Sequence, residues 1–442
     1  MIEKMMMWLM DPTMDTAMKN MLTSKYEENP FLMTTIAEKL TPRAIMEAGM
    51  RAQTGKEIKR PIGSPIVLSP WEKILLNPRQ IHQLPTDSKK SVQTKTTIGP
   101  NSKKPLNLDT PIMLTGMSYG GSLSLPMKMA IAKGTSMAGT STNTGESGLT
   151  NEERDNANLL IGQYNRGMRM KISDLKHLDA IEVQLGQGAW GGASEITTKA
   201  DNIGDHLRAT WDLKEGEDST IKPTFPNVKT SEDIVNLVNE IKSKHDVPVG
   251  VKIAGSDFIE FDLAVLAKTN ADYIVVDGSE GGTAGAPTTL EDDVGLPALH
   301  SLVRAVDWLV ENNIRDKFQI IASGGLTTPG HFLKALAIGA DAVYIGSIAL
   351  MATLQSQMAK AMPKYPPPQL ALYSGKLKDE FDVEEGAKDL ANFLNSCTTE
   401  MKHAIQVMGK KSTTELNRDD LVSMDKDLAE FMTIRYGASH RR

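Results

Sequence analysis

The chain has 442 residues, of which 40% are hydrophobic and 24% charged, and its 49 Lys and Arg against 55 Asp and Glu give a formal net charge of -6. This slightly acidic balance excludes the basic surface that binds a phosphate backbone, so no nucleic-acid partner is expected. The single cysteine, Cys397, excludes an intrachain disulfide and an iron–sulfur or zinc site built from several thiolates of this chain.

Hydropathy and length narrow the class of protein further. No segment approaches the roughly 18 to 20 apolar residues that span a bilayer, and acids and a proline interrupt the start, MIEKMMMWLMDP. We therefore expect a cytoplasmic protein without a membrane span. The length suits one barrel of about 250 residues with extensions. We divide the chain into an N-terminal helical extension and linker (1–108), a barrel (109–350) and a C-terminal helical extension packed on the barrel (351–442).

The first 60 residues are rich in Met, Ala, Lys and Glu and predict short helices that pack on a larger body. Methionine at helical spacing usually belongs to a core, so we interpret the stripe as core, with a membrane-surface or partner-binding face as the alternative. Residues 61–108, where prolines recur, predict extended connecting chain. The stripe consists of Met6, Met7, Leu9, Met10, Met14 and Met18.

From about residue 110, short β-rich runs alternate with helical runs, which is typical of βα units around a parallel sheet. Eight such units predict an α/β fold, a closed (β/α)8 TIM barrel rather than an open doubly wound sheet. Helices are expected over 231–245, 297–313 and 329–340. The predicted strands are 111–118, 138–145, 158–164, 180–188, 247–255, 271–278, 318–325 and 341–347.

Two segments outside this repeat have predicted roles of their own. Residues 190–245 form a long insertion between the fourth and fifth strands, on the face where such barrels carry their active sites, and predict a lid. Past the eighth strand, a Pro-rich loop, PKYPPP, precedes helices such as that over 384–409. We expect this region to cap the barrel or to join subunits of a homo-oligomer.

The ends of the last two strands predict a phosphate site. Ser323, Gly324 and Gly325 end the seventh strand, and Gly346 and Ser347 end the eighth, each ahead of a helix. Small residues there let backbone N–H groups and helix N-termini converge on a phosphate. The alternative is that these glycines only make tight turns.

The sixth strand ends in DGSEGGTAGAP, which contains Glu280, Gly281 and Gly282. Such a loop permits close approach of backbone to a flat ring, although it could serve a turn alone. Near the end of the fifth strand, Lys252 lies between apolar residues, and a buried ammonium needs a negative partner. That partner is either a reduced flavin, charged near N1, or Glu182 on the fourth strand.

The first and second strands end in residues that suit the floor and edge of a ring site. Gly116, Met117 and Ser118 would form the floor. Asn143 and Glu146, in the run NTGE, would place polar groups at the ring edge.

Taken in order, GMSYGG, STNTGESGLTNEE, LGQGAWGG, DGSEGGTAGAP, VGLP, ASGGL and IGADAVYIGSIAL resemble one known family. The chain resembles the FMN-binding synthase domain of glutamate synthase and of smaller glutamate-synthase-like proteins, among them the large subunit of N-methylglutamate synthase. The resemblance runs from about 110 to 350 and more loosely to about 420. It implies a flavoprotein oxidoreductase of glutamate biosynthesis. Its reduced FMN would deliver a hydride to an imine made from 2-oxoglutarate, or a relative, and ammonia or an amine.

The resemblance also assigns individual residues. Lys252, Glu280 and Glu146 would take part in catalysis, and Gln187, Gly188 and Trp190 would face the substrate. The residues expected around FMN are Met117, Ser118, Asn143, Gln163, Lys252, Gly281, Gly282, Ser323, Gly324, Gly325, Gly346 and Ser347.

Three departures from the family pattern change the expectation. The family continues its fourth-strand motif as QGAKPG, whereas here Trp190 replaces the lysine, so we expect a narrower pocket that disfavours a dicarboxylate. No cysteine cluster follows the eighth strand, so no iron–sulfur cluster is expected. The N-terminal amidotransferase is also absent, so an electron-donor protein or an amidotransferase subunit is the expected partner.

Other functions are weighed by residue type. A reaction like that of inosine-monophosphate dehydrogenase needs a cysteine in a barrel loop, and Cys397 lies outside the barrel. A 2-hydroxy-acid oxidase needs a histidine base late in the barrel, where this chain has Glu280. The remaining alternatives are amine transfer as in N-methylglutamate synthase and a non-catalytic, flavin-carrying subunit of a larger complex.

Overall fold

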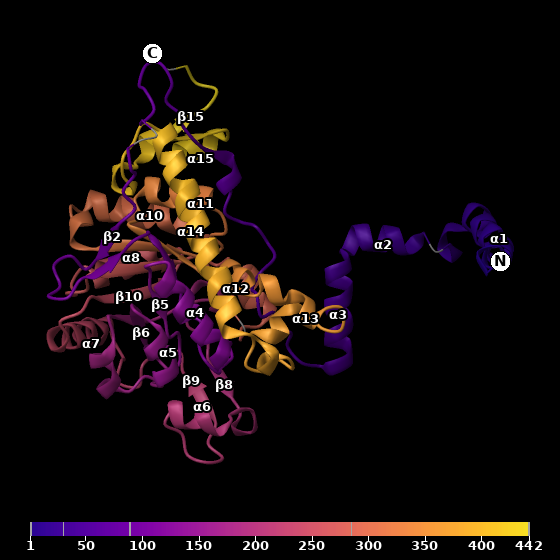
Figure 1. Ribbon diagram of the computed structural model, residues 1–442, viewed down its shortest axis with the longest axis horizontal. Helices are drawn as coiled ribbons and strands as arrows, with labels where there is room; N and C mark the ends of the chain where they lie inside the picture. Colours follow the sequence, from indigo (N-terminus) through magenta and orange to yellow (C-terminus); the bar gives the residue numbers. More distant parts are fainter. Residues whose placement is uncertain (1, 30, 88–89, 284, 441–442) are drawn as a thin grey trace. The chain divides into compact units, whose positions relative to one another are not determined.

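In the computed structural model, which describes residues 2–29, 31–87, 90–283 and 285–440, eight short strands lie side by side in one parallel sheet. The strand order is β4-β13-β12-β11-β10-β7-β6-β5, and the Leu114 amide closes the ring by donating to the Ser141 carbonyl at 3.1 Å. The predicted (β/α)8 TIM barrel is confirmed (Figure 1). Its strands are β4 (Ile112–Leu114), β5 (Thr142–Asn143), β6 (Leu160–Asn165), β7 (Ala180–Gln184), β10 (Val249–Ala254), β11 (Tyr273–Asp277), β12 (Gln319–Ser323) and β13 (Ala342–Ile345).

Helices cover the outside of the barrel, and the three helices predicted between strands all form. The helix after the insertion begins with a capping box, in which Thr230 and Asp233 satisfy each other's backbone amides. Thr328 caps the helix that follows the seventh barrel strand, with a proline at its first position. The helices are α4 (Leu125–Met137), α5 (Asn151–Asn156), α7 (Ser231–Lys244), α8 (Ile259–Leu266), α9 (Thr288–Asp293), α10 (Ala298–Glu311), α11 (Pro329–Ile338) and α12 (Ser347–Thr353).

The structure corrects the prediction of connecting chain over 61–108. β2 (Thr96–Ile98) and β3 (Leu106–Leu108) form an antiparallel hairpin whose apolar side chains pack on inward-facing residues of the barrel. This hairpin lies at the starts of the barrel strands, because the Gly99 amide donates to Gln319 Oε1 at 2.9 Å. β1 (Ile74–Leu76) pairs with a strand near the C-terminus. Strands of three residues are too short to show a period in the sequence.

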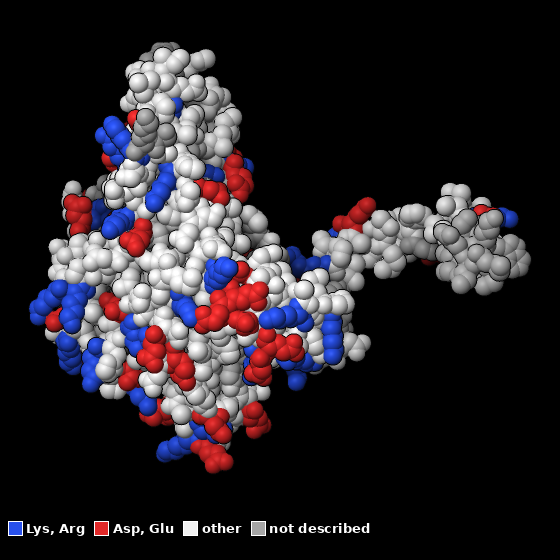
Figure 2. All heavy atoms as spheres, viewed as in Figure 1, with Lys and Arg blue, Asp and Glu red and all other residues white. Residues whose placement is uncertain are grey.

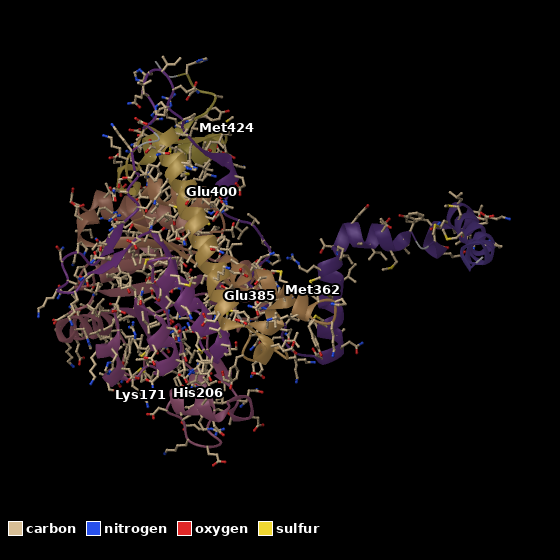
Figure 3. The ribbon with its side chains drawn as sticks, viewed as in Figure 1. Lys171, His206, Met362, Glu385, Glu400 and Met424 are labelled. Atoms are coloured by element: carbon tan, nitrogen blue, oxygen red, sulfur yellow. The ribbon has the colours of Figure 1, made fainter. Side chains whose placement is uncertain are left out.

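The long helix α14 (Val383–Val407) packs lengthwise on α4. Its apolar face is buried, and Gly134 of α4 lets the two backbones approach, because a Cβ there would lie 2.8 Å from the Ala387 carbonyl. Glu385 and Glu400 mark this helix in Figure 3. The remaining elements of the region are α13 (Met358–Ala361), β14 (Leu421–Ser423), α15 (Lys426–Phe431) and β15 (Arg435–Tyr436).

The insertion after β7 folds as a small unit of β8 (Ile196–Thr198), α6 (Asp205–Thr210) and β9 (Ser219–Ile221). It docks through an apolar cluster in which Leu207 and Trp211 pack against Tyr119 from the loop after β4. His206, labelled on α6 in Figure 3, adds a polar contact, since its Nδ1 lies 3.0 Å from the Tyr119 hydroxyl.

Residues Met1–Ile58 form a separate compact unit from Lys59–Arg442. The predicted N-terminal helices are present as α1 (Ile2–Thr23), α2 (Leu32–Leu40) and α3 (Pro42–Thr54). Met14 and Met18 are 59% and 55% exposed, so the N-terminal unit does not by itself bury these two residues of the methionine stripe. Met6, Met7, Leu9 and Met10 lie outside the residues whose side chains are described.

The surface agrees with the overall charge. Lys and Arg alternate with Asp and Glu over the face of the barrel unit that Figure 2 shows. Among the described residues, no helix combines the length and the apolar character needed to cross a bilayer.

Candidate functional site

A cavity of about 480 Å³ opens where the barrel strands end. Side chains and backbone from the ends of most barrel strands line it, as does part of the insertion. Barrels of this class carry their active sites at this end, and the volume suits a cofactor or substrate. The predicted site residues in the lining are Met117, Ser118, Glu146, Gln187, Trp190, Lys252, Glu280, Gly281, Gly282, Ser323, Gly324, Gly325, Gly346 and Ser347.

Three predicted site residues, Asn143, Gln163 and Gly188, lie behind this lining instead. Asn143 and Gln163 are fully buried, with side chains about 3 Å from the position a Cβ would take on Gly116, which itself lines the cavity. Both donate to the buried carboxylate of Glu182, as does the Tyr344 hydroxyl. These side chains therefore form a polar layer inside the barrel that supports the floor of the cavity.

Gly188 joins two strand ends. A Cβ on it would lie 1.8 Å from the Gly278 carbonyl oxygen, and its amide donates to Asp277 Oδ2 at 3.1 Å. The sequence suggested contact with substrate, whereas this glycine is needed because only a hydrogen fits between the two backbones.

Lys252 lines the cavity with its ammonium 3.3 Å from Asp277 Oδ2 and 3.2 Å from Thr115 Oγ1. Its protein partner is therefore Asp277, which sequence reasoning missed, and not Glu182. Asp277 also accepts from the Ser323 hydroxyl, so one carboxylate ties β10, β11 and β12 together at the mouth. The sequence signal that could have found Asp277 is an acidic residue at the end of a barrel strand.

The two predicted phosphate turns lie together in the lining. Gly324 and Gly325 have φ angles of 109° and 66°, which favour glycine, and they precede α11. Among the described residues, none accepts a hydrogen bond from the amides of Gly324, Gly325, Gly346 or Ser347. These amides are unused donors at the cavity wall, which suits an anion.

Residues 61–72, here called the strap, form a part of the wall that the sequence did not predict. The strap lies directly on the glycine loop after β11, since a Cβ on Gly63 would come within 2.5 Å of the Gly281 carbonyl oxygen. The Ser347 hydroxyl donates to the Ile62 carbonyl at 3.3 Å. Near the start of α11, Glu72 contacts His331 at 3.0 Å, and this hydrogen bond lowers the pKa of Glu72.

Glu146 lies buried in the wall beside two arginines. Gln184 Nε2 donates to its Oε1 at 2.8 Å, and Arg166 Nη2 lies 3.9 Å from the same oxygen. Burial raises the pKa of Glu146, against the opposing effect of Arg166 and Arg169. Arg169, which also lines the cavity, was missed by sequence reasoning. It follows β6 in the turn NRGMR. Two arginines within four residues at a strand end were a sequence signal for an anion-binding position.

Glu280 and Trp190 have neighbours that limit what they can do. Glu280 Oε2 accepts from the Ala298 amide at 2.7 Å and so caps α10, while its Oε1 is buried without a described partner. Trp190 is 5% exposed and donates from Nε1 to the Thr283 hydroxyl. Its ring packs with Ile221 and Ala286, so it forms an apolar wall of the cavity.

Fold and site together define a (β/α)8-barrel enzyme with its active-site cavity at the carboxyl ends of the strands. Among the described residues, no group of three or more metal-ligating side chains occurs.

The chain belongs to the glutamate synthase family, because the family model of the conserved region in glutamate synthase matches residues 69–411. It is 30% identical over 424 residues to a glutamate synthase large subunit-like protein of Rhizobium meliloti, covering 91% of this chain and 95% of that protein. It is 34% identical over 339 residues to the archaeal glutamate synthase [NADPH] of Methanocaldococcus jannaschii, covering 75% of this chain and 65% of that protein.

Solved structures with the same barrel include flavocytochrome b2 with benzoylformate, at a TM-score of 0.52 and 17% identity over 84% of this chain and 80% of that one. A chimera of (S)-mandelate dehydrogenase matches at a TM-score of 0.51 and 12% identity over 79% of this chain and 88% of that one. At these identities the likeness shows the fold alone.

Proposed function

We propose that this protein is an FMN-dependent oxidoreductase of the glutamate-synthase type. It would reduce an imine, formed from a 2-oxo acid and ammonia or an amine, to glutamate or a related amino acid. Family membership supports the reaction type, and the geometry of the mouth supports the cofactor.

The observation that carries the proposal is the set of unused amides in the two turns after β12 and β13. Four backbone donors without a described acceptor, on adjacent strands and at one cavity wall, suit a phosphate of a cofactor. The small residues on the floor and on the glycine loop leave room for a flat ring. Met117, Ser118, Gly281 and Gly282 would hold that ring, and the turn residues would hold its phosphate.

When bound, FMN supplies the hydride that reduces the C=N bond. Lys252 places a positive charge at the cavity wall, where it favours negative charge in a bound group. Glu146, whose pKa is raised by burial, can hold a proton at its carboxyl group beside the cavity. The insertion and the strap line the cavity, where their side chains would limit the access of water to a bound imine.

The test begins with the purified full chain. We expect a yellow protein with about one FMN per chain and, after reduction, reoxidation that depends on a 2-oxo acid together with ammonia or methylamine. The amino acid formed identifies the acceptor, and the better amine separates the glutamate-synthase reaction from the N-methylglutamate-synthase reaction. A preparation that takes up no FMN, or a reduced form that no imine reoxidises, would count against the proposal.

The phosphate contact can be tested separately. Replacing Gly325 by Asp would place a carboxylate among the amides, and the left-handed backbone there disfavours any side chain. We expect FMN uptake to be lost. Gly192→Asp is the matched control, because φ at Gly192 is also positive but no atom lies within 4 Å of the position that a Cβ would take there. This control variant should leave FMN uptake intact.

A further inference from the structure

Arg169 is fixed in place on three sides. Its Nε donates to Ser219 Oγ at 2.9 Å, and its Nη1 donates to the Glu146 carbonyl at 3.2 Å. Its guanidinium lies over the Trp211 ring, with Cζ 3.6 Å from the ring centre. Ser219 and Trp211 belong to the insertion, so the insertion holds this side chain against the barrel. A guanidinium held in this way loses little conformational entropy when it binds a ligand.

One nitrogen of the same guanidinium has no described hydrogen-bond acceptor. Nη2 is buried and has no hydrogen-bond partner among the described residues. No described carboxylate lies within ion-pair distance of Arg169, and the nearby Glu146 carboxylate already accepts from Gln184. Burial lowers the pKa of Arg169 to about 10, so the side chain still carries its charge at neutral pH. A buried cation with an unused donor is costly, and such a cost is relieved by an anionic ligand.

The position of Arg169 says which space the ligand would occupy. The residue is 3% exposed and lines the cavity, as do Glu146, Ser118 and Gly121. On another part of the wall, Trp190 offers only an indole already bonded to Thr283. Trp190 therefore cannot neutralise an anion, whereas Arg169 can.

We infer that Arg169 is the carboxylate-binding cation of this cavity and determines specificity for an acidic 2-oxo acid. This inference rests on the proposed function, which it extends by naming the residue that recognises the acceptor. It also revises the expectation that Trp190 makes the pocket unsuited to a dicarboxylate, because the cation would come from the turn after β6 instead of the loop after β7. Arginine can pair with a carboxylate through two parallel N–H groups, and here Nη2 would donate together with the second N–H of Nη1, whose first N–H is bonded to the Glu146 carbonyl.

The test measures ligand binding without turnover. The full chain, loaded with FMN and kept oxidised, is titrated with 2-oxoglutarate and with pyruvate by calorimetry. Arg169→Met should weaken binding of 2-oxoglutarate by about 10-fold or more, as expected for loss of a charge-assisted hydrogen bond. Arg169→Lys keeps the positive charge but not the paired N–H groups of the guanidinium. Its affinity for 2-oxoglutarate should fall between that of the wild type and that of Arg169→Met. FMN content and the thermal midpoint are measured on every variant.

Arg166 provides the matched control. It lies in the same turn and is equally buried, and its Nε and Nη2 also lack a described hydrogen-bond partner. It differs from Arg169 in position: its Nη1 donates to the Lys222 and Pro223 carbonyls, and the residue does not line the cavity. Arg166→Met should therefore change the dissociation constant of 2-oxoglutarate by no more than about twofold. If Arg169→Met fails to fold, the dissociation constant of 2-oxoglutarate for Arg169→Lys decides whether the inference holds.

The outcomes separate this inference from the proposed function. Unchanged affinity for 2-oxoglutarate in both variants at position 169 would overturn the inference, and so would a wild-type protein that binds neither acid. A wild-type protein that binds these acids through Arg169 but never reduces an imine would leave the inference standing while the proposed function fails. Equal weakening by the Arg166 and Arg169 changes would indicate a structural role and would also overturn it.

Discussion

At the scale of single residues, Lys252 and Asp277 form a buried ion pair at the mouth of the barrel. Both side chains are almost fully buried, so each charge relies on the other. Asp277→Asn leaves the ammonium unpaired, and we expect a loss of about 3 to 5 kcal/mol in the free energy of unfolding, measured by urea denaturation.

The double change Lys252→Met with Asp277→Asn is the control for that experiment. It removes both charges, so it should be clearly more stable than Asp277→Asn alone. If the single and double variants lose the same free energy, the ion pair does not explain the effect.

Cys397 gives a second prediction at this scale. Its thiol is buried in α14, and burial raises its pKa to about 11. At pH 8 only about one thiol in a thousand would be ionised, and that thiolate would be covered. We expect no reaction with a disulfide reagent in the native protein and one equivalent of reaction in guanidinium chloride. Rapid labelling of the native protein at pH 8 would contradict the buried position.

At the scale of elements, the insertion is held by a small apolar cluster rather than by strand pairing with the barrel. Leu207 of α6 is fully buried and packs so closely on Gly120 that a Cβ there would lie 2.3 Å from its side chain. Leu207→Ala should cost about 2 to 5 kcal/mol of local stability, because a cavity replaces the contact.

The measurement for Leu207→Ala is hydrogen exchange. Amides of residues 196–221 should exchange faster, while amides of the barrel strands should keep their protection. Leu84→Ala is the control, because Leu84 is 73% exposed in the same compact unit. It should change the exchange rates of neither the insertion nor the barrel strands. Uniformly faster exchange throughout the barrel would show that the insertion is not a separate docking element.

At the scale of the whole molecule, every described residue that lines the cavity belongs to the unit Lys59–Arg442. A chain that starts at Lys59 should therefore fold, take up FMN with unchanged affinity and unfold at nearly the same temperature as the full chain. The full-length protein, measured beside it, is the control. Loss of FMN uptake on truncation would show that the N-terminal unit contributes to the site.

The sequence by itself determined the barrel and the small residues that end its last two strands. Most strands and helices of the barrel can be recognised from their own composition and hydrophobic period. Examples are the strand YIVVD of β11 and the capped helix α7. The strand ends meet at one edge of any parallel barrel, so Ser323, Gly324, Gly346 and Ser347 were predictable as neighbours.

Only the tertiary structure decided which residues pair across the barrel and which segments line the cavity at its mouth. The partner of Lys252, the buried edge of Arg169 and the position of the strap all depend on contacts between segments far apart in the sequence. Local pattern carries no information about such contacts, because a side chain's partners are set by how neighbouring strands stagger and how loops pack on them. For the same reason Asn143, Gln163 and Gly188, at strand ends as expected, proved to lie behind the cavity wall.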